Sequence, residues 1–220
     1  MYLGEGKAAE LKRLVSDWEG DLVIFDEELT PAQGKNLEDL LGVRVMDRSE
    51  LILDIFATRA RSSEARMQVE LAQLEYLLPR LRRMWIHLSR IRGGIGLRGP
   101  GETQLETDRR LIRKRIAVLK SKLRQVAKAR EVQRQQREES FRAVLVGYTN
   151  AGKSSLLSAL SGSDLFVEDR LFTTLDSTTR GVNLGQGYQA LITDTVGFIN
   201  KIPPLVVAAF RATLQELHEA

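Results

Sequence analysis

An eight-residue turn containing two glycines constrains the fold of this chain more than any other feature. Residues 147–154 read G-Y-T-N-A-G-K-S, follow the apolar run Ala143 to Val146, and precede a leucine-rich helical stretch at 156–160. Strand, glycine turn and helix in this order let successive backbone N–H groups converge on anionic oxygens, and the helix adds its positive N-terminal end. A plain glycine turn would need neither Lys153 nor Ser154 at these offsets. The segment therefore predicts a phosphate-binding loop within an α/β domain.

The members of this loop have distinct expected roles. The whole loop would surround the phosphates: Gly147, Tyr148, Thr149, Asn150, Ala151, Gly152, Lys153 and Ser154. Lys153 would reach the β- and γ-phosphates and is the expected catalytic residue of the loop, while the Ser154 hydroxyl would bind Mg²⁺. The loop alone is compatible with GTPases, ATPases and kinases.

A second motif, forty positions after Ser154, supplies a carboxylate for the metal. Residues 189–193 read as a strand, and Asp194-Thr195-Val196-Gly197 follows as a D-x-x-G turn. We expect this turn to contact the nucleotide, with Asp194 holding Mg²⁺ through a water and the Gly197 N–H meeting a γ-phosphate. D-x-x-G alone is often an ordinary turn. At this distance behind the phosphate loop, it favours a nucleotide switch of the GTPase type.

The segment between the two motifs is expected to supply a threonine hydroxyl to the metal. Four threonines compete for this role, at 173, 174, 178 and 179, and spacing does not decide among them. At least two would instead be β-formers that enter a strand over 181–184. Phe198 follows Gly197, where many GTPases carry a glutamine that orients water. Because phenylalanine has no acid–base or hydrogen-bonding group, another group must position the water, and we expect slow intrinsic hydrolysis.

Composition is typical of a soluble globular protein. The chain has 220 residues, of which 43% are hydrophobic, and no apolar run approaches the roughly 18 to 20 residues of a membrane span. The N-terminus lacks the apolar core of a signal peptide. With no cysteine and only two histidines, disulfides and thiolate metal sites are excluded and a histidine metal centre is not expected. We expect a monomer in the cytoplasm, with peripheral attachment to a membrane left open.

The first region, 1–61, alternates helix and strand. We expect a helix from about Lys7 to Trp18, a buried strand over 21–25, a helix from Pro31, a strand over 43–46 and a third helix from Ser49. Thr30 and Gln33 have the spacing of a capping box, and Pro31 suits a first helical position. Strand, helix and strand with short turns imply a small parallel sheet. The region has no nucleotide fingerprint, so its default role is a scaffold or docking surface.

The second region, 62–140, has the apolar period of long helices. One seam recurs at intervals of three and four: Met67, Leu71, Leu74, Leu78, Leu81, Trp85 and Leu88. A matching seam runs through a helix that ends near Arg137: Leu105, Ile112, Ile116, Leu119, Leu123 and Val126. Two such helices joined by a glycine-rich segment predict an antiparallel hairpin. Pro79 should kink or split the first helix.

The predicted tip of the hairpin, 92–104, is rich in glycine and arginine. Around it, residues 79–142 carry 19 Lys and Arg against 6 Asp and Glu, a net charge of +13, while the rest of the chain carries −9. This asymmetry is typical of a polyanion partner. We interpret the tip as a basic finger whose Arg92 and Arg98 contact RNA. The alternative is an ordinary long loop whose glycines serve turn geometry and whose arginines keep it soluble.

These motifs resemble those of the HflX family of ribosome-associated GTPases. The resemblance lies in residues 147–154, in Asp194 to Ile199, and in the stretch 93–110, which reads G-G-I-G-L-R-G-P-G-E-T-Q-L-E-T-D-R-R. It also includes 2–7 and 51–56, so it spans nearly the whole chain. It implies an α/β fold: a small parallel-sheet N-terminal domain with a long antiparallel helical hairpin, then a P-loop GTPase domain over 141–220.

The resemblance also implies an activity. The family's members are Mg²⁺-dependent enzymes that bind GTP or GDP and hydrolyse GTP. They bind the large ribosomal subunit and its RNA, and they split or rescue stalled ribosomes as part of a stress response. In the family's switch pattern the metal-binding, catalytic threonine falls on Thr174. The nucleotide-contacting residues of the switch are then Phe172, Thr173, Thr174, Leu175 and Asp176, with Ser177 where the family has a proline.

The third region, 141–220, is expected to be an incomplete GTPase domain. It is too short for a whole one, and no Asn-Lys-x-Asp follows the D-x-x-G turn, since Asn200 to Pro203 lacks the aspartate. Guanine preference therefore rests on resemblance alone. We expect a piece of a longer protein, lacking part of both domains, that binds nucleotide weakly or not at all. The alternatives are a non-catalytic RNA- or ribosome-binding module with an idle nucleotide site, and a P-loop ATPase or kinase.

Overall fold

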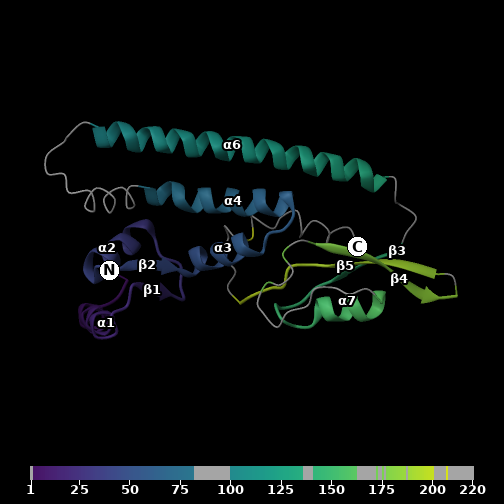
Figure 1. The fold of residues 1–220 in the computed structure, drawn as a ribbon, viewed down its shortest axis with the longest axis horizontal. Coiled ribbons are helices and arrows are strands. Elements are labelled where there is room, and N and C mark those ends of the chain that lie inside the picture. The colour runs from purple at the N-terminus through teal and green to yellow at the C-terminus, as the bar shows by residue number, and fades with distance from the viewer. Residues whose placement is uncertain are drawn as a thin grey trace. The chain divides into compact units, whose positions relative to one another are not determined.

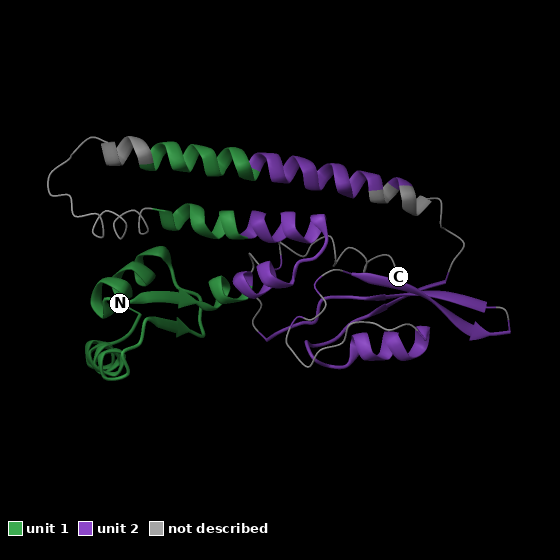
Figure 2. Cartoon of the chain, viewed as in Figure 1, with its two compact units in different colours: residues 1–52, 73–116 green, residues 53–72, 117–220 purple. Residues whose placement is uncertain are grey.

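The chain divides into two compact units, seen here in a computed structural model (Figures 1 and 2). The structure describes residues 2–81, 100–135, 141–162, 172, 175, 177–186, 188–200 and 207, with the backbone alone at 100–104, 130–131 and 133–135. Unit 1 comprises 1–52 and 73–116, and unit 2 comprises 53–72 and 117–220. Each combines helices with a sheet, which confirms the predicted α/β class.

Unit 1 contains a two-stranded parallel sheet. Strand β1 (Leu22–Phe25) pairs with β2 (Arg44–Asp47), and α2 (Pro31–Leu41) packs against β2 and against α1 (Glu5–Asp17). The buried core here is Leu29, Leu37, Leu41 and Val45. The prediction of a buried first strand is wrong, because Leu22 and Ile24 are 42% and 50% exposed. Side chains alternate across a strand, and only the Val23 and Phe25 face packs on this core.

The start of α2 follows the sequence signals closely. The Thr30 hydroxyl accepts a hydrogen bond from the Gln33 N–H at 3.2 Å, and the Thr30 N–H donates to the Gln33 side chain at 2.9 Å. The helix ends at Gly42, whose φ of 75° is left-handed and suits a residue without a side chain. The predicted capping box is therefore confirmed.

Strand β2 ends in a buried polar network around Asp47, which is 2% exposed. Its carboxylate accepts hydrogen bonds from the Leu29 N–H, the Glu50 N–H and the Arg80 guanidinium, at 3.2, 2.9 and 3.3 Å. Arg80 also donates to the Leu29 carbonyl at 2.7 Å and lies over the ring of Tyr76. Burial, and then the charge of Asp47, raise the pKa of Tyr76, so its neutral hydroxyl donates to Glu50.

Helices α3 (Arg48–Arg59) and α4 (Ser63–Leu77) continue the chain. The α-helix ends at Leu77 and a 3₁₀ turn, η1 (Leu78–Arg80), follows, so the regular helix is interrupted at Pro79, where the sequence predicts a kink or a split. The most buried side chains of α4 are Ala65, Val69, Ala72 and Tyr76, whereas the predicted seam at Met67, Leu71 and Leu74 is half-buried. The helix thus has a second apolar stripe, which the period of leucines did not indicate.

The long basic helix α6 (Pro100–Gln135) has 36 residues. It begins earlier than Leu105, because Pro100 fits the first turn of a helix, where its missing N–H has no partner to lose. Its predicted seam is confirmed: Leu119 is buried, and Leu105, Ile112, Ile116, Leu123 and Val126 are half-buried. Unit 1 contains the end of α4 and the first part of α6, whereas unit 2 contains the start of α4 and the rest of α6 (Figure 2). Two antiparallel helices would be divided in this way.

Unit 2 contains a three-stranded sheet in the order β3-β5-β4. Strand β3 (Phe141–Leu145) runs parallel to β5 (Tyr188–Asp194), and β4 (Thr178–Gly185) runs antiparallel to β5. Helix α7 (Lys153–Ser161) packs Leu157 on Val182, Ala190 and Ile192. The register places Leu145 opposite Asp194, so the two predicted motifs leave the sheet side by side.

Within the described ranges, no helix is both long enough and apolar enough to cross a membrane.

Candidate functional site

The phosphate loop connects the end of β3 to the start of α7, as predicted. Gly152 has a φ of 82° and Asn150 a φ of 60°, two left-handed positions that turn the backbone sharply. Lys153 folds back over the loop and donates to the carbonyls of Tyr148 and Gly147 at 2.8 and 3.3 Å. Partial burial lowers the pKa of Lys153, and the nearby Asp194 carboxylate offsets part of that shift. The loop therefore places a partly desolvated cation beside the backbone amides.

The metal-side residues lie together. The Ser154 hydroxyl donates to Asp194 Oδ2 at 2.5 Å, and Asp194 is 1% exposed. Its other oxygen, Oδ1, is buried and has no hydrogen-bond partner within the part of the chain that the structure describes. A buried carboxylate oxygen without a donor is costly unless a cation faces it. The hydroxyl and carboxylate oxygens are the hard ligands that Mg²⁺ prefers, so this ion fits the site.

The small number of protein ligands at this site is also typical of magnesium, which takes its other ligands from water and phosphate. Among the described residues, no group of three or more acidic or histidine side chains surrounds a common point. Calcium and zinc sites normally supply most ligands from the protein, whereas Mg²⁺ is held by one or two carboxylates with water and phosphate oxygens. Ser154 and Asp194 are consistent with the second arrangement.

The D-x-x-G turn lies directly on the phosphate loop. The Phe198 N–H donates to the Gly147 carbonyl at 2.9 Å, and the Thr149 N–H donates to the Phe198 carbonyl at 2.8 Å. A Cβ at Gly197 would come within 2.5 Å of the Thr149 backbone and 2.9 Å of Lys153 Nζ, so only glycine fits. The motif needs a glycine here because a side chain would clash with the phosphate loop, not because the turn requires a special backbone conformation.

The switch segment is anchored by two apolar side chains. Phe172 and Leu175 are 5% and 3% exposed, and the Phe172 ring meets Phe56 of α3 edge to face, with centroids 4.7 Å apart. Phe172 has a φ of 57°, a left-handed backbone that is costly for an aromatic residue. Sequence reasoning placed Phe56 on a helix but had no signal for this contact, because such pairs have no sequence period.

Several predicted site residues lie outside the described residues: Thr173, Thr174, Asp176, Arg92 and Arg98. The nucleotide contacts of Phe172 to Asp176, the choice of Thr174 and the basic finger therefore stay predictions. Thr195 and Val196 are described, and the Thr195 side chain is buried.

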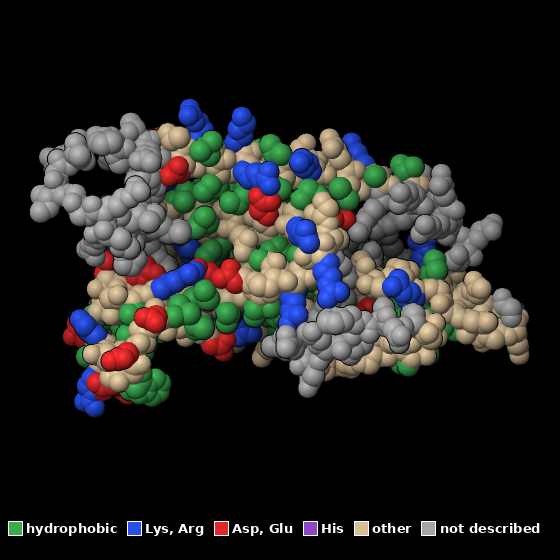
Figure 3. Space-filling model, in the orientation of Figure 1, with side chains coloured by type: hydrophobic (Ala, Val, Ile, Leu, Met, Phe, Trp, Pro, Cys, Tyr) green, Lys and Arg blue, Asp and Glu red, His purple; other side chains and the backbone are tan. Residues whose placement is uncertain are grey.

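Helix α6 presents basic side chains along much of its length (Figure 3). The exposed ones are Arg110, Arg113, Lys114, Arg115, Lys120, Lys122, Arg124 and Lys128. They share the surface with exposed Leu111 and Val118, which are 57% and 39% exposed. A long helix with one dominant sign of charge suits a polyanionic partner.

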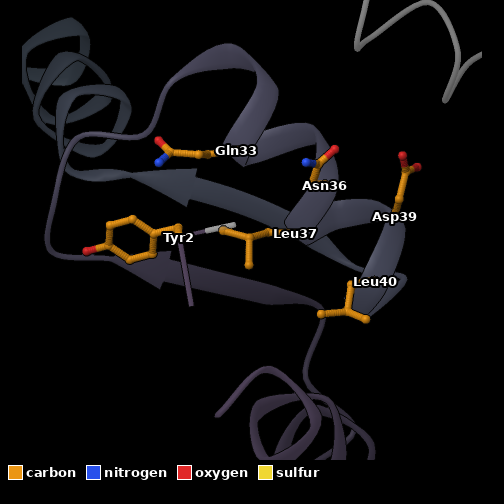
Figure 4. Close-up of a pocket in the computed structure, with 6 residues that line it drawn as sticks. All are labelled: Tyr2, Gln33, Asn36, Leu37, Asp39 and Leu40. Carbon is orange, nitrogen blue, oxygen red and sulfur yellow. The ribbon is translucent and has the colours of Figure 1, made fainter. Parts of the chain in front are cut away.

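A separate pocket of about 330 Å³ lies beside α2 in unit 1 (Figure 4). It is lined by Tyr2, Gln33, Asn36, Leu37, Asp39 and Leu40. The Gln33 side chain is already bonded to Thr30 in the helix cap. No orphaned polar atom among the described residues faces this pocket, so it does not compete with the phosphate loop as the candidate site.

Three family models match the chain in succession. Residues 1–57 match the N-terminal part of a GTP-binding GTPase, 59–137 match its middle region, and 142–218 match a 50S ribosome-binding GTPase. Together the three matches include residues from both compact units and the whole phosphate loop.

Known proteins agree with these matches. The chain is 56% identical to the GTPase HflX of Caldanaerobacter subterraneus and 52% identical to that of Escherichia coli, covering 100% of this chain and 52% of each relative. A crystal structure of SsGBP with GDP has a TM-score of 0.50 and 29% identity over 97% of this chain and 56% of its own. The chain spans about half the length of the curated relatives it matches. By its three family matches and its identity to these relatives along its whole length, the chain belongs to the HflX family of GTPases.

Proposed function

We propose that this chain contributes the phosphate and Mg²⁺ side of a GTP-binding, GTP-hydrolysing site. The observation that carries the proposal is the buried Asp194 carboxylate, which shares a hydrogen bond with Ser154 and keeps one oxygen unpartnered among the described residues. This arrangement lies at the mouth of a G-x-x-x-x-G-K-S loop, where phosphates would bind. Family membership supports guanine as the base.

The residues would act mainly by position and charge. Backbone N–H groups of 147–154 would surround the phosphates, and Lys153 would turn from the loop carbonyls toward the β- and γ-phosphates. Ser154 and Asp194 would hold Mg²⁺, which supplies charge neutralisation to the phosphate oxygens when bound. Thr174 would complete this set. Phe198 can neither orient nor deprotonate water, so we propose that intrinsic hydrolysis is slow and that faster hydrolysis depends on a partner.

We further propose that the partner is the large ribosomal subunit, with the outcome that stalled ribosomes are split or rescued. The charge of 79–142 and the exposed basic side chains of α6 support a polyanion. The description of the matched family as 50S ribosome-binding supports the ribosome as that polyanion. The regions 1–61, 62–140 and 141–220 would then act as scaffold, RNA-directed hairpin and nucleotide site, in a cytoplasmic monomer.

Nucleotide competition tests the first part. In a protein extended to the length of the curated relatives, a fluorescent GDP derivative should bind only with Mg²⁺ present, and unlabelled GTP should displace it at far lower concentration than ATP. Equal displacement by ATP would favour the ATPase or kinase reading. Displacement by neither would favour an idle nucleotide site, and with it the non-catalytic RNA-binding module.

Co-sedimentation with large ribosomal subunits tests the second part. Binding should differ between GTP, GDP and no nucleotide, and replacing both Arg92 and Arg98 by alanine should weaken it while nucleotide affinity stays intact. The matched control replaces Lys12 and Arg13 on α1, which changes the net charge equally. Equal weakening by both pairs would show that the tip is not a separate contact.

A further inference from the structure

Thr195 has an unassigned position in the site, between the metal-side carboxylate and the start of the phosphate loop. It follows Asp194 at the end of β5 and is 3% exposed. Its hydroxyl donates to the Leu145 carbonyl at 2.8 Å, a link between residues 50 positions apart. The side chain therefore points to strand β3, not to solvent or to a nucleotide.

The hydroxyl extends the sheet beyond its last strand pair. The parallel register pairs Leu145 with Asp194, where β3 and β5 both end. After this pair the two chains enter the phosphate loop and the D-x-x-G turn, so the strand ladder no longer fixes their separation. The Thr195 bond holds them together at the point where Asp194 must be placed.

The need for such a bond follows from the chemistry of the carboxylate. Asp194 is expected to hold Mg²⁺ through a water, so its carboxylate must keep Oδ2 on the Ser154 hydroxyl while Oδ1 stays available to that water. Groups behind a metal ligand orient it, and losing them commonly costs about 10- to 100-fold in metal affinity. A shift of the turn relative to β3 would move Asp194 directly.

We propose that Thr195 is a positioning residue: its hydroxyl, bonded to the Leu145 carbonyl, sets the Asp194 carboxylate for Mg²⁺. This deepens the proposed function and rests on it. The expectation that Thr195 contacts the nucleotide stays a prediction, and the proposed role concerns its hydroxyl. The same bond fixes the turn that presents Phe198 to Gly147 and Thr149.

The same strand provides a matched control. Thr193 is 8% exposed, and its hydroxyl lies 2.8 Å from that of Thr179 on β4. Thr193→Val removes a part-buried hydroxyl bond in the same sheet without touching the link to Leu145. A purely structural role would make Thr195→Val and Thr193→Val alike, since each loses one part-buried hydrogen bond.

The first test is a Mg²⁺ titration, with a fluorescent GDP derivative, of the chain extended to the length of its curated relatives. Thr195→Val should raise the Mg²⁺ concentration for half-maximal binding at least about tenfold. Thr195→Ser, which keeps the hydroxyl, and Thr193→Val should both leave this concentration at the wild-type value. A Thr195→Val chain with the wild-type Mg²⁺ dependence would overturn the proposal. Failure of the wild-type chain to bind in any Mg²⁺ concentration would instead count against the proposed function.

A second measurement needs no nucleotide. Amide hydrogen exchange at Phe198 and Thr149 reports the two hydrogen bonds between turn and loop. Thr195→Val should speed exchange at both amides about fivefold, the change expected when a local opening loses one net hydrogen bond. Thr195→Ser and Thr193→Val should not. Unchanged exchange at Phe198 and Thr149 in Thr195→Val would overturn the positioning role, whatever the chain binds.

Discussion

In each unit a parallel strand ends in a buried aspartate, and the two aspartates differ in the hydrogen-bond donors that surround them. Asp47 closes β2 and is 2% exposed, and Asp194 closes β5 and is 1% exposed. Asp47 accepts from two backbone N–H groups and from Arg80. Among the described residues, Asp194 accepts a hydrogen bond from Ser154 alone, and its Oδ1 has no partner.

This difference separates a structural carboxylate from one reserved for a ligand. Burying an ionised carboxylate is expensive unless donors or cations compensate it. Around Asp47 the protein supplies the compensation itself, so nothing remains to be bound. Around Asp194 the described residues supply one hydroxyl, which leaves Oδ1 for the Mg²⁺ and water of the proposed function. Both aspartates end a strand and are almost fully buried, so their surroundings differ mainly in the number of hydrogen-bond donors.

The largest effect should come from Asp47→Ala. The Arg80 side chain is 12% exposed and would lose its carboxylate, as would the Leu29 N–H, so we expect a loss of about 3 to 5 kcal/mol in unfolding free energy. Urea unfolding measures it. Asp26→Ala is the control, because Asp26 is 90% exposed in its pair with Arg48, and should cost at most about 1 kcal/mol. Equal losses would show that Asp47 is not a structural centre.

Asp194→Asn should have the reverse signature. Asparagine keeps an acceptor for Ser154 and removes the charge, so stability should change little. The Mg²⁺ concentration for half-maximal binding of a fluorescent GDP derivative should rise about 10- to 100-fold, as for loss of a metal-site carboxylate or its support. Asp47→Asn should leave the Mg²⁺ dependence unaltered. A comparable change in both variants would break the distinction between the two aspartates.

The smallest effect concerns pH and belongs to the Asp47 network alone. The pKa of Tyr76 is raised above its ordinary value of 10.0 by burial and by Asp47, so above that pH the unfolded chain loses a proton that the folded chain keeps. Stability should therefore fall as pH rises past about 10, and Tyr76→Phe should flatten this fall. Unfolding curves between pH 8 and 11 measure it. Tyr148→Phe, which changes a side chain 68% exposed, should leave the slope as it is.

Sequence signals predicted the local features well. The Thr30 cap, the interruption at Pro79, the α6 seam and the two nucleotide motifs each depend on a few neighbouring residues or on a helical period, and each is found. Asp194 could be singled out because its motif has a fixed spacing from the phosphate loop. Asp47 could not, because its partners Leu29 and Arg80 lie 18 and 33 positions away and follow no motif.

The sequence patterns also did not predict how distant segments pack together. The buried stripe through Ala65 and Val69 carries small side chains, so a search for leucine periods passes over it. Whether Leu22 faces a core or solvent depends on what lies on each face of the sheet, which alternation alone does not state. The motif places Thr195 among the expected nucleotide contacts, but it gives no signal for the hydrogen bond of the Thr195 hydroxyl to the Leu145 carbonyl of β3.

The edge-to-face contact of Phe56 with Phe172 determines how this protein can be dissected. The matched family models divide the chain after 57 and after 137, but this contact joins α3 to the switch segment within unit 2. A truncated chain starting at 141 would lose a ring pair worth about 0.5 to 1.5 kcal/mol beyond its buried area. It would also retain the strained backbone of Phe172 without the partner that compensates it. Nucleotide affinities measured on such a piece would describe an altered switch, so residues 53–72 belong in any minimal nucleotide-binding unit.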